Sequence, residues 1–225
     1  MPGRDRTQVI VVGAGVAGLA CAADLAAGGT TVRVLEAADT VGGRMRTDRR
    51  GGFLLDRGFQ VFNTSYPQVQ RRLNLRALQL RAFTPGVLLH TAAGRVRFAD
   101  PTRQPGQAGD LLRGRLAGPA DLAALTVLSA RDGLGPASWI RRAPDHSTLA
   151  ALAAAGISAE LTDRLFRPFL AGVFLEDELE TSSRFFHLVW RSMLRGSLTL
   201  PRRGIQAVPE QLAAALEPGV IQLEA

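Results

Sequence analysis

The feature that most constrains the fold is a glycine-rich loop lying between an apolar run and a helix-compatible run. Residues 9–12 are Val-Ile-Val-Val, a continuous β-branched run typical of a parallel strand buried on both faces. Residues 19–27 favour a helix rich in small side chains, and residues 31–35 predict a second strand with Glu36 at its end. The loop has the form G-x-G-x-x-G and comprises Gly13, Ala14, Gly15, Val16, Ala17 and Gly18. This order of elements predicts an α/β fold with a Rossmann-like parallel sheet.

Three glycines and one acid of this segment have separate physical roles in a dinucleotide site. Gly13 allows the tight turn out of the strand, Gly15 lets the backbone approach a pyrophosphate, and Gly18 lets the helix pack closely on the strand. The helix N-terminus presents unpaired N–H groups and a positive dipole to phosphates. Glu36 follows near the spacing expected for an acid that accepts ribose hydroxyls, which disfavours NADP. The segment predicts a dinucleotide site rather than a glycine-rich turn with only a packing role.

The residues after the second strand distinguish between flavin and nicotinamide dinucleotides. Residues 36–47 resemble the extended dinucleotide motif of the flavin-containing amine oxidase superfamily, which includes amine oxidases, protoporphyrinogen oxidases and phytoene desaturases. The resemblance implies that the backbone at Gly42 and Gly43 lies close to FAD, as does the Glu36-Ala37 segment. It also implies that Arg44 contacts the pyrophosphate or ribityl region, since a guanidinium suits phosphate oxygens. The alternative is an ordinary turn with solvated arginines.

A third block supports the same resemblance. Residues 51–62 have hairpin character, because a glycine pair precedes apolar strand residues. They resemble the family's segment that passes near the flavin ring. The resemblance implies backbone contacts to the cofactor from Gly58, Phe59, Gln60 and Val61. Asp56 is expected to be a turn or ion-pair residue.

The middle of the chain indicates organisation more than chemistry. Residues 66–81 predict a helix, and residues 83–98 predict a hairpin turning near Gly94. From residue 110 to 187 the pattern is mainly helical. One expected helix is capped by Asp110, and others span residues 119–131, 148–155 and 182–195. A further helix is expected to start at Ser158 and to kink or end at Pro168.

The family resemblance turns this pattern into domains. It implies a first segment of an FAD-binding domain over residues 1–84, an inserted α+β substrate domain over residues 85–199, and the start of a return into the FAD-binding domain over residues 200–225. Residues 208–216 predict a helix, and a strand is expected to start at residue 219. Members of this superfamily are longer, so the C-terminal part of the FAD domain is expected to be missing. The chain is predicted to be truncated, with weak FAD affinity and little activity of its own.

Composition narrows the remaining function classes. All 27 basic residues are Arg, which excludes a lysine Schiff base, and the single Cys21 excludes an intrachain disulfide. Cys21 is expected to be a small core residue of a cytoplasmic protein. The three His residues, His90, His146 and His187, are not paired at metal-ligand spacing, so no metal is expected and His187 is predicted to be a core or boundary residue. No transmembrane segment is expected, although the formal net charge of +7 allows peripheral contact with anionic lipid.

These observations support one main hypothesis. The chain is predicted to be an FAD-dependent oxidoreductase that oxidises a C–N or C–C bond by hydride transfer to flavin. Its expected substrate is a small molecule, a class that includes lipophilic compounds. No catalytic residue is assigned. Two alternatives remain: an NAD-dependent dehydrogenase and a non-catalytic nucleotide-binding fragment that needs a C-terminal partner. A third alternative, a basic nucleic-acid binder, rests on net charge alone, and the main hypothesis expects no nucleic-acid partner.

Overall fold

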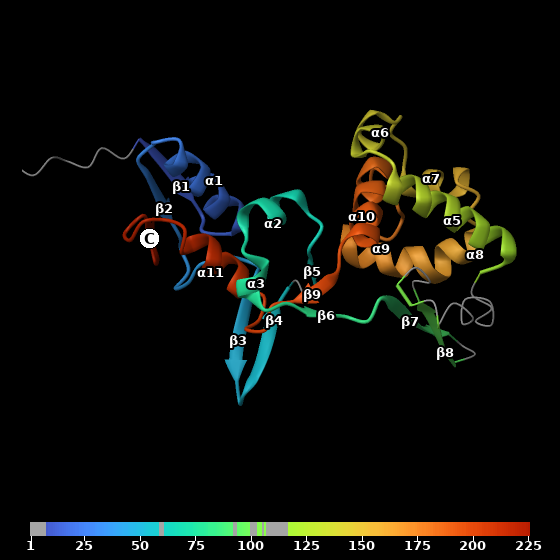
Figure 1. Ribbon diagram of the computed structural model, residues 1–225, viewed down its shortest axis with the longest axis horizontal. Helices are drawn as coiled ribbons and strands as arrows, with labels where there is room; N and C mark the ends of the chain where they lie inside the picture. Colours follow the sequence, from blue (N-terminus) through green and yellow to red (C-terminus); the bar gives the residue numbers. More distant parts are fainter. Residues whose placement is uncertain (1–7, 59–60, 92–93, 100–102, 105, 107–116) are drawn as a thin grey trace, which may run out of the picture. The chain divides into compact units, whose positions relative to one another are not determined.

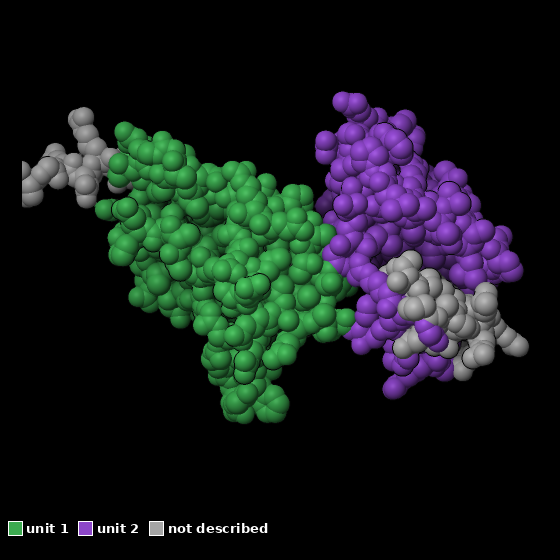
Figure 2. Space-filling view, in the orientation of Figure 1, with its two compact units in different colours: residues 1–83, 197–225 green, residues 84–196 purple. Residues whose placement is uncertain are grey.

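The computed structural model describes residues 8–58, 61–91, 94–99, 103–104, 106 and 117–225. The chain divides into two compact units, which Figure 2 shows in different colours. Unit 1 comprises residues 1–83 and 197–225, whereas unit 2 comprises residues 84–196. Unit 1 is therefore assembled from two separate stretches of chain, and unit 2 from one continuous stretch.

A parallel sheet forms one part of unit 1. Its strands β1 (Val9–Val12), β2 (Val32–Leu35) and β10 (Ile221–Gln222) are arranged in the order β1-β2-β10, and both pairs are parallel. Helices α1 (Val16–Ala27) and α11 (Ala207–Ala213) pack on this sheet through a shared apolar core (Figure 1). The buried members of that core are Ala14, Leu19, Ala22, Val32, Val34, Leu212 and Leu216. The predicted α/β fold with a parallel sheet is confirmed.

The strand β1 differs from its prediction because only one of its faces is covered. Val9 and Val11 are half-buried, whereas Ile10 and Val12 are 59% and 85% exposed. Val11 belongs to the core that α1 covers, and no described element covers the opposite face. Cys21 was also expected in the core, but it lies on the exposed side of α1, so that prediction is wrong.

The rest of unit 1 consists of short antiparallel elements. Strands β3 (Arg46–Arg50) and β4 (Phe53–Arg57) form a hairpin that turns at Gly51 and Gly52 with positive φ values of 55° and 84°. Hairpin character was predicted over residues 51–62, but the hairpin begins at residue 46 and the glycine pair forms its turn. A second sheet has the order β5-β9-β6 and joins β5 (Phe62–Asn63) and β6 (Arg81–Ala82) to β9 (Leu198–Leu200). Its core contains Phe62, Leu78, Ile205, Ala207 and Val208.

The single helix predicted over residues 66–81 is wrong. The structure has two helices there, α2 (Pro67–Arg72) and α3 (Leu75–Leu78). Leu73 between them adopts an extended conformation, and the Asn74 side chain accepts a hydrogen bond from Ala77 N at 3.1 Å, which starts the second helix. A residue that offers its own cap competes with continuation of the helix, and the apolar spacing did not reveal this.

Unit 2 combines one hairpin with a set of helices. Strands β7 (Gly86–Thr91) and β8 (Gly94–Ala99) pair antiparallel, as predicted. The helices are α5 (Pro119–Leu134), α6 (Ala137–Arg142), α7 (Thr148–Ala154), α8 (Ala159–Leu161), α9 (Arg167–Phe174) and α10 (Ser183–Arg195), with a π-helical turn η2 (Thr162–Phe166) between α8 and α9. Their shared core includes the fully buried side chains of Leu152, Leu161, Phe166, Leu170, Leu179 and Phe186.

Pro168 lies within a helical segment rather than at its end. The π-helical turn precedes α9, so Pro168 occupies one of the first positions of that helix, where a missing N–H costs little. The helical segment therefore does not end at Pro168, and the helix type changes from π to α just before this residue. The predicted cap at Asp110 lies outside the described residues.

Candidate functional site

The glycine-rich loop has the geometry that its sequence predicts. Gly13 has a φ of +95° and its N–H donates to the carbonyl of Leu35 at 2.7 Å, which ties the loop to the end of β2. A Cβ added to Gly18 would lie 2.0 Å from the carbonyl oxygen of Gly13. Helix α1 can therefore approach β1 this closely only with glycine at position 18. Around Gly13 and Gly15, by contrast, a Cβ would meet no atom of the described chain within 4 Å.

The N-terminus of α1 carries no protein cap. Gly15 is the N-cap residue and cannot supply a side-chain acceptor, and the first turn contains no acidic residue. The first main-chain bond of the helix runs from Leu19 N to Gly15 O at 2.9 Å. The N–H groups of Val16, Ala17 and Gly18 precede it and belong to the set that an α-helix leaves without an internal partner. Open space at Gly15 and free donors on α1 together suit an anionic group such as a pyrophosphate.

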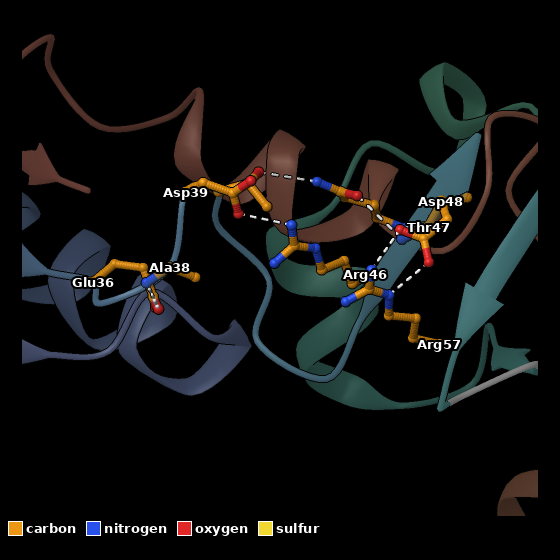
Figure 3. A network of polar contacts seen from close by, with 9 residues as sticks. Glu36, Ala38, Asp39, Arg46, Thr47, Asp48 and Arg57 are labelled. Carbon is orange, nitrogen blue, oxygen red and sulfur yellow. Dashed lines mark hydrogen bonds and ion pairs between the residues drawn. The ribbon is translucent and has the colours of Figure 1, made fainter. Parts of the chain in front are cut away.

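Glu36 lies beside this loop at the carboxyl end of β2. Its Oε2 accepts a hydrogen bond from Ala14 N at 2.6 Å. Its Oε1 accepts one from Ala38 N at 2.9 Å (Figure 3). The main-chain N–H of Glu36 donates to Gln222 O at 2.9 Å, so β10 holds the residue from the other side. The carboxylate is thereby fixed at the loop with further lone pairs left to accept from ribose hydroxyls. Ala37, also expected at the cofactor, is exposed.

A second glycine pair closes against the first loop. Gly42 N donates to Ala14 O at 2.9 Å, and Gly15 and Gly42 form an isolated parallel bridge. Both Gly42 and Gly43 have positive φ, at 119° and 56°. Although Gly15 and Gly42 are 27 positions apart in the sequence, the fold brings together the two segments that the sequence assigned to one cofactor. Close backbone approach explains why the loop uses glycine here.

Arg44 and the end of the hairpin complete the predicted set. Arg44 is exposed, and among the described residues its guanidinium has no hydrogen-bond or ion-pair partner. Gly58 has a φ of +78°, and a Cβ there would lie 3.1 Å from Arg44 O, so the end of β4 packs against this turn. Val61 is 46% exposed. Phe59 and Gln60 lie outside the described residues.

A polar network that the sequence did not predict supports the turn between β2 and β3. Arg46 pairs with Asp39 at 2.7 Å, and Arg57 pairs with Asp48 at 2.6 Å across the hairpin (Figure 3). The hydrogen bond from Arg57 lowers the pKa of Asp48, with a smaller contribution from nearby positive charges. These pairs hold the segment that carries Gly42, Gly43 and Arg44.

The same network includes residues from the C-terminal stretch of unit 1. Gln206 accepts from Thr47 N at 3.1 Å and donates to Thr40 Oγ1 at 3.0 Å. Asp56 accepts from Thr47 Oγ1 at 2.6 Å and from Ile205 N at 3.0 Å. Asp56 was expected in a turn or an ion pair, but it lies within β4 and accepts hydrogen bonds from neutral groups, so that expectation is wrong. Sequence reasoning missed Gln206 because its partners are more than 150 residues away.

These residues fit FAD in chemistry and in space. The open space at Gly15, which a Cβ would occupy, lies at the uncapped N-terminus of α1. The fixed carboxylate of Glu36 lies beside it. Groups of three or more side chains suited to a metal ion are absent from the described residues. Within the same residues, no helix is long and apolar enough to cross a membrane.

Comparison with known proteins agrees with this geometry. Residues 16–225 match the model of the family described as flavin containing amine oxidoreductase. Over 87 residues, covering 38% of this chain and 16% of the relative, the sequence is 37% identical to coproporphyrinogen III oxidase of Propionibacterium freudenreichii subsp. freudenreichii.

Solved structures extend the similarity to nearly the whole chain. An oxidoreductase from Methanosarcina mazei matches 95% of this chain and 50% of its own, with a TM-score of 0.68 at 19% identity. Cyclohexylamine oxidase from Brevibacterium oxydans matches 97% of this chain and 51% of its own, with a TM-score of 0.66 at 21% identity. The chain thus has the fold of these proteins and spans about half their length. With the family match and the glycine-rich site in agreement, the chain belongs to the flavin-containing amine oxidoreductase family, whose cofactor is FAD.

Proposed function

We propose that this chain forms the dinucleotide-binding and substrate parts of an FAD-dependent oxidoreductase that oxidises a C–N or C–C bond. The observation that carries the proposal is the convergence of three segments: the Gly13–Gly18 loop, Glu36, and the Gly42-Gly43 pair bridged to Gly15. FAD supplies the hydride acceptor when bound. The chain's own residues bind and orient the dinucleotide.

Each segment has a proposed role in holding the cofactor. The N–H groups at the start of α1 donate to the pyrophosphate, and the absence of a Cβ at Gly15 lets the phosphates approach. Glu36 accepts hydrogen bonds from the ribose hydroxyls. Arg44, exposed beside this loop, donates to phosphate or ribityl oxygens. The backbone of residues 58–61 contacts the cofactor nearer its flavin ring.

In this proposal the two units have different functions. Unit 1, residues 1–83 and 197–225, binds FAD and corresponds to the FAD-binding domain predicted over residues 1–84 and 200–225. Unit 2, residues 84–196, binds the substrate and corresponds to the substrate domain predicted over residues 85–199. The substrate is a small molecule, and the residues of the substrate domain determine whether the reaction is amine oxidation or C–C desaturation.

A direct titration tests the cofactor assignment. The purified 225-residue chain is titrated with FAD and, separately, with NAD, with binding followed by quenching of flavin fluorescence and by calorimetry. We expect saturable FAD binding with little affinity for NAD. Tight NAD binding without FAD binding would favour a nicotinamide dehydrogenase, and failure to bind either dinucleotide would contradict the proposal.

A further inference from the structure

Unit 2 contains a pocket that the proposed cofactor site does not use. Its volume is about 210 Å³, below the range of about 300–1,000 Å³ that holds drug-sized ligands. One wall is apolar and is formed by Ala143, Pro144, Ala151, Ala154 and Ala155. The polar lining residues are Arg131, His146, Ser183 and His187. The pocket is thus amphipathic and suits a small molecule with one polar end.

The polar wall is organised by a buried pair between α5 and α10. His187 Nδ1 lies 2.7 Å from Asp132 Oδ2, and the Asp132 side chain has no exposure to solvent. A carboxylate in such a position requires a hydrogen-bonded partner, because burial of an unpaired charge is costly. Asp132 therefore fixes the orientation of the imidazole. Since Nδ1 is occupied, Nε2 is the ring atom that His187 has for a ligand.

The charges around the pocket favour an anion. Arg131 is exposed and lines the pocket, and within the described part of the chain its guanidinium has no acceptor. Arg191 donates to the backbone carbonyl of Asp132, which adds a second positive charge close to the buried pair. Ser183 is buried at the start of α10, where helix N–H groups add positive potential. Two acids lie next to these residues, and both have partners: Asp132 Oδ2 pairs with His187, and Asp145 Oδ1 accepts hydrogen bonds from Ser182 Oγ at 2.7 Å and Ser183 Oγ at 3.4 Å.

We propose that this pocket binds a short-chain organic carboxylate. The carboxylate group contacts Arg131 and His187, and the alkyl group lies against the alanine wall of α7. Asp132 Oδ2 lies 2.7 Å from Nδ1, so a ligand in the pocket contacts the imidazole at Nε2. The proposal concerns unit 2 alone and does not depend on FAD.

Nuclear magnetic resonance of the full chain, labelled at histidine, tests the proposal with butyrate as the probe. We expect the side-chain resonances of His187 to shift saturably with butyrate and not with butyramide, which has the same shape without the charge. His90, exposed on β7, serves as an internal reference that should not shift. No saturable change at His187, or equal changes with butyramide, would overturn the assignment. Tighter binding of inorganic phosphate than of butyrate would overturn its restriction to carboxylates.

Two pairs of variants separate binding from folding. Ala154→Leu fills the pocket from α7 and should abolish the butyrate response, whereas Ala153→Leu places the same side chain on the same helix outside the pocket and should preserve it. Arg131→Gln should weaken butyrate about tenfold through loss of a charge-assisted hydrogen bond. Arg141→Gln, on the exposed surface of α6, should leave affinity unchanged. Equal affinity for Ala154→Leu and wild type would contradict the site.

Discussion

Gly15 and Gly18 lie three residues apart, but Gly15 borders open space whereas Gly18 is tightly packed. Substitutions at the two positions can therefore distinguish an effect on cofactor binding from an effect on folding. A Cβ on Gly18 would lie 2.0 Å from Gly13 O, whereas a Cβ on Gly15 would meet nothing of the described chain within 4 Å. We expect Gly18→Ala to lower the free energy of unfolding by about 1–3 kcal/mol, the usual cost of overpacking. Urea unfolding followed by circular dichroism measures this change.

Gly15→Ala is the matched control for that prediction. Its φ of −71° suits alanine, so we expect its unfolding free energy to stay within about 0.5 kcal/mol of wild type. Its FAD affinity should fall, because the new methyl group occupies the space proposed for the pyrophosphate. Retained affinity in a folded Gly15→Ala protein would argue against phosphate binding at this loop.

Glu36 connects the loop and the proposed ribose site through one carboxylate. Glu36→Gln keeps the size of the side chain but replaces one acceptor oxygen with an NH₂ group, so only one of the N–H groups of Ala14 and Ala38 can be satisfied. We expect FAD affinity to fall about tenfold or more, because hydrogen bonds to charged groups contribute about 1.5–3 kcal/mol. Fluorescence titration measures the loss.

The control for this change is Glu217→Gln, which removes the same charge from an exposed position. If both variants lost affinity equally, general electrostatics rather than the Glu36 contacts would explain the effect.

At the scale of elements, Glu176 holds the loop between α9 and α10 by accepting several hydrogen bonds. Its Oε1 accepts from Thr181 Oγ1 at 2.8 Å, and its Oε2 accepts from Leu179 N at 2.7 Å. The hydrogen bond from Thr181, followed by those from the backbone, lowers the pKa of Glu176 below its ordinary value of 4.5. These contacts hold Leu179 at a positive φ of 60° with its side chain fully buried.

A lowered pKa makes this contribution to stability depend on pH. The folded state binds the proton of Glu176 less tightly than the unfolded state, so the stabilisation is complete above pH 4.5 and is lost as pH falls through the folded-state pKa. We expect Glu176→Gln to be less stable than wild type at pH 7 and the difference to narrow towards pH 3. Urea midpoints at each pH measure it, with the exposed Glu178→Gln as the control. A constant difference across that range would contradict the prediction.

Elements whose signals are local could be predicted from the sequence, and contacts between distant segments could not. The β1–loop–α1 unit depends on glycine geometry within ten residues, and Ser147 caps α7 through a bond to Ala150 N, three residues away. By contrast, the long helix expected over residues 66–81 is interrupted, because the cap at Asn74 outweighs the apolar spacing.

The candidate site shows the same division. The glycines and Glu36 were identified from their spacing along the chain. Gln206 supports the same region through Thr40 and Thr47, and the pocket of unit 2 brings His146 and His187 together although they are 41 residues apart. Both arrangements depend on how separate elements pack, and no motif in the sequence encodes that packing.

At the scale of the whole molecule, unit 2 is inserted between two adjacent strands of unit 1. Phe83 N donates to Leu198 O at 2.9 Å, and Ala82 lies opposite Thr199 in the pairing of β6 with β9. The two points where the chain leaves and re-enters unit 1 are therefore already neighbours. Unit 1 also contains its own apolar cores, as does unit 2.

This arrangement predicts that unit 1 folds without its insertion. Replacing residues 85–196 with Asn-Gly would join β6 to β9 by a two-residue type I′ turn, which suits the twist of an antiparallel pair. We expect the shortened protein to unfold cooperatively and to bind FAD with an affinity close to that of the full chain, because all proposed cofactor contacts belong to unit 1. Circular dichroism and flavin fluorescence measure the two properties. A Gly-Gly-Gly-Gly linker in place of Asn-Gly controls for the turn. If both shortened proteins folded but failed to bind FAD, the assignment of the cofactor to unit 1 alone would be wrong.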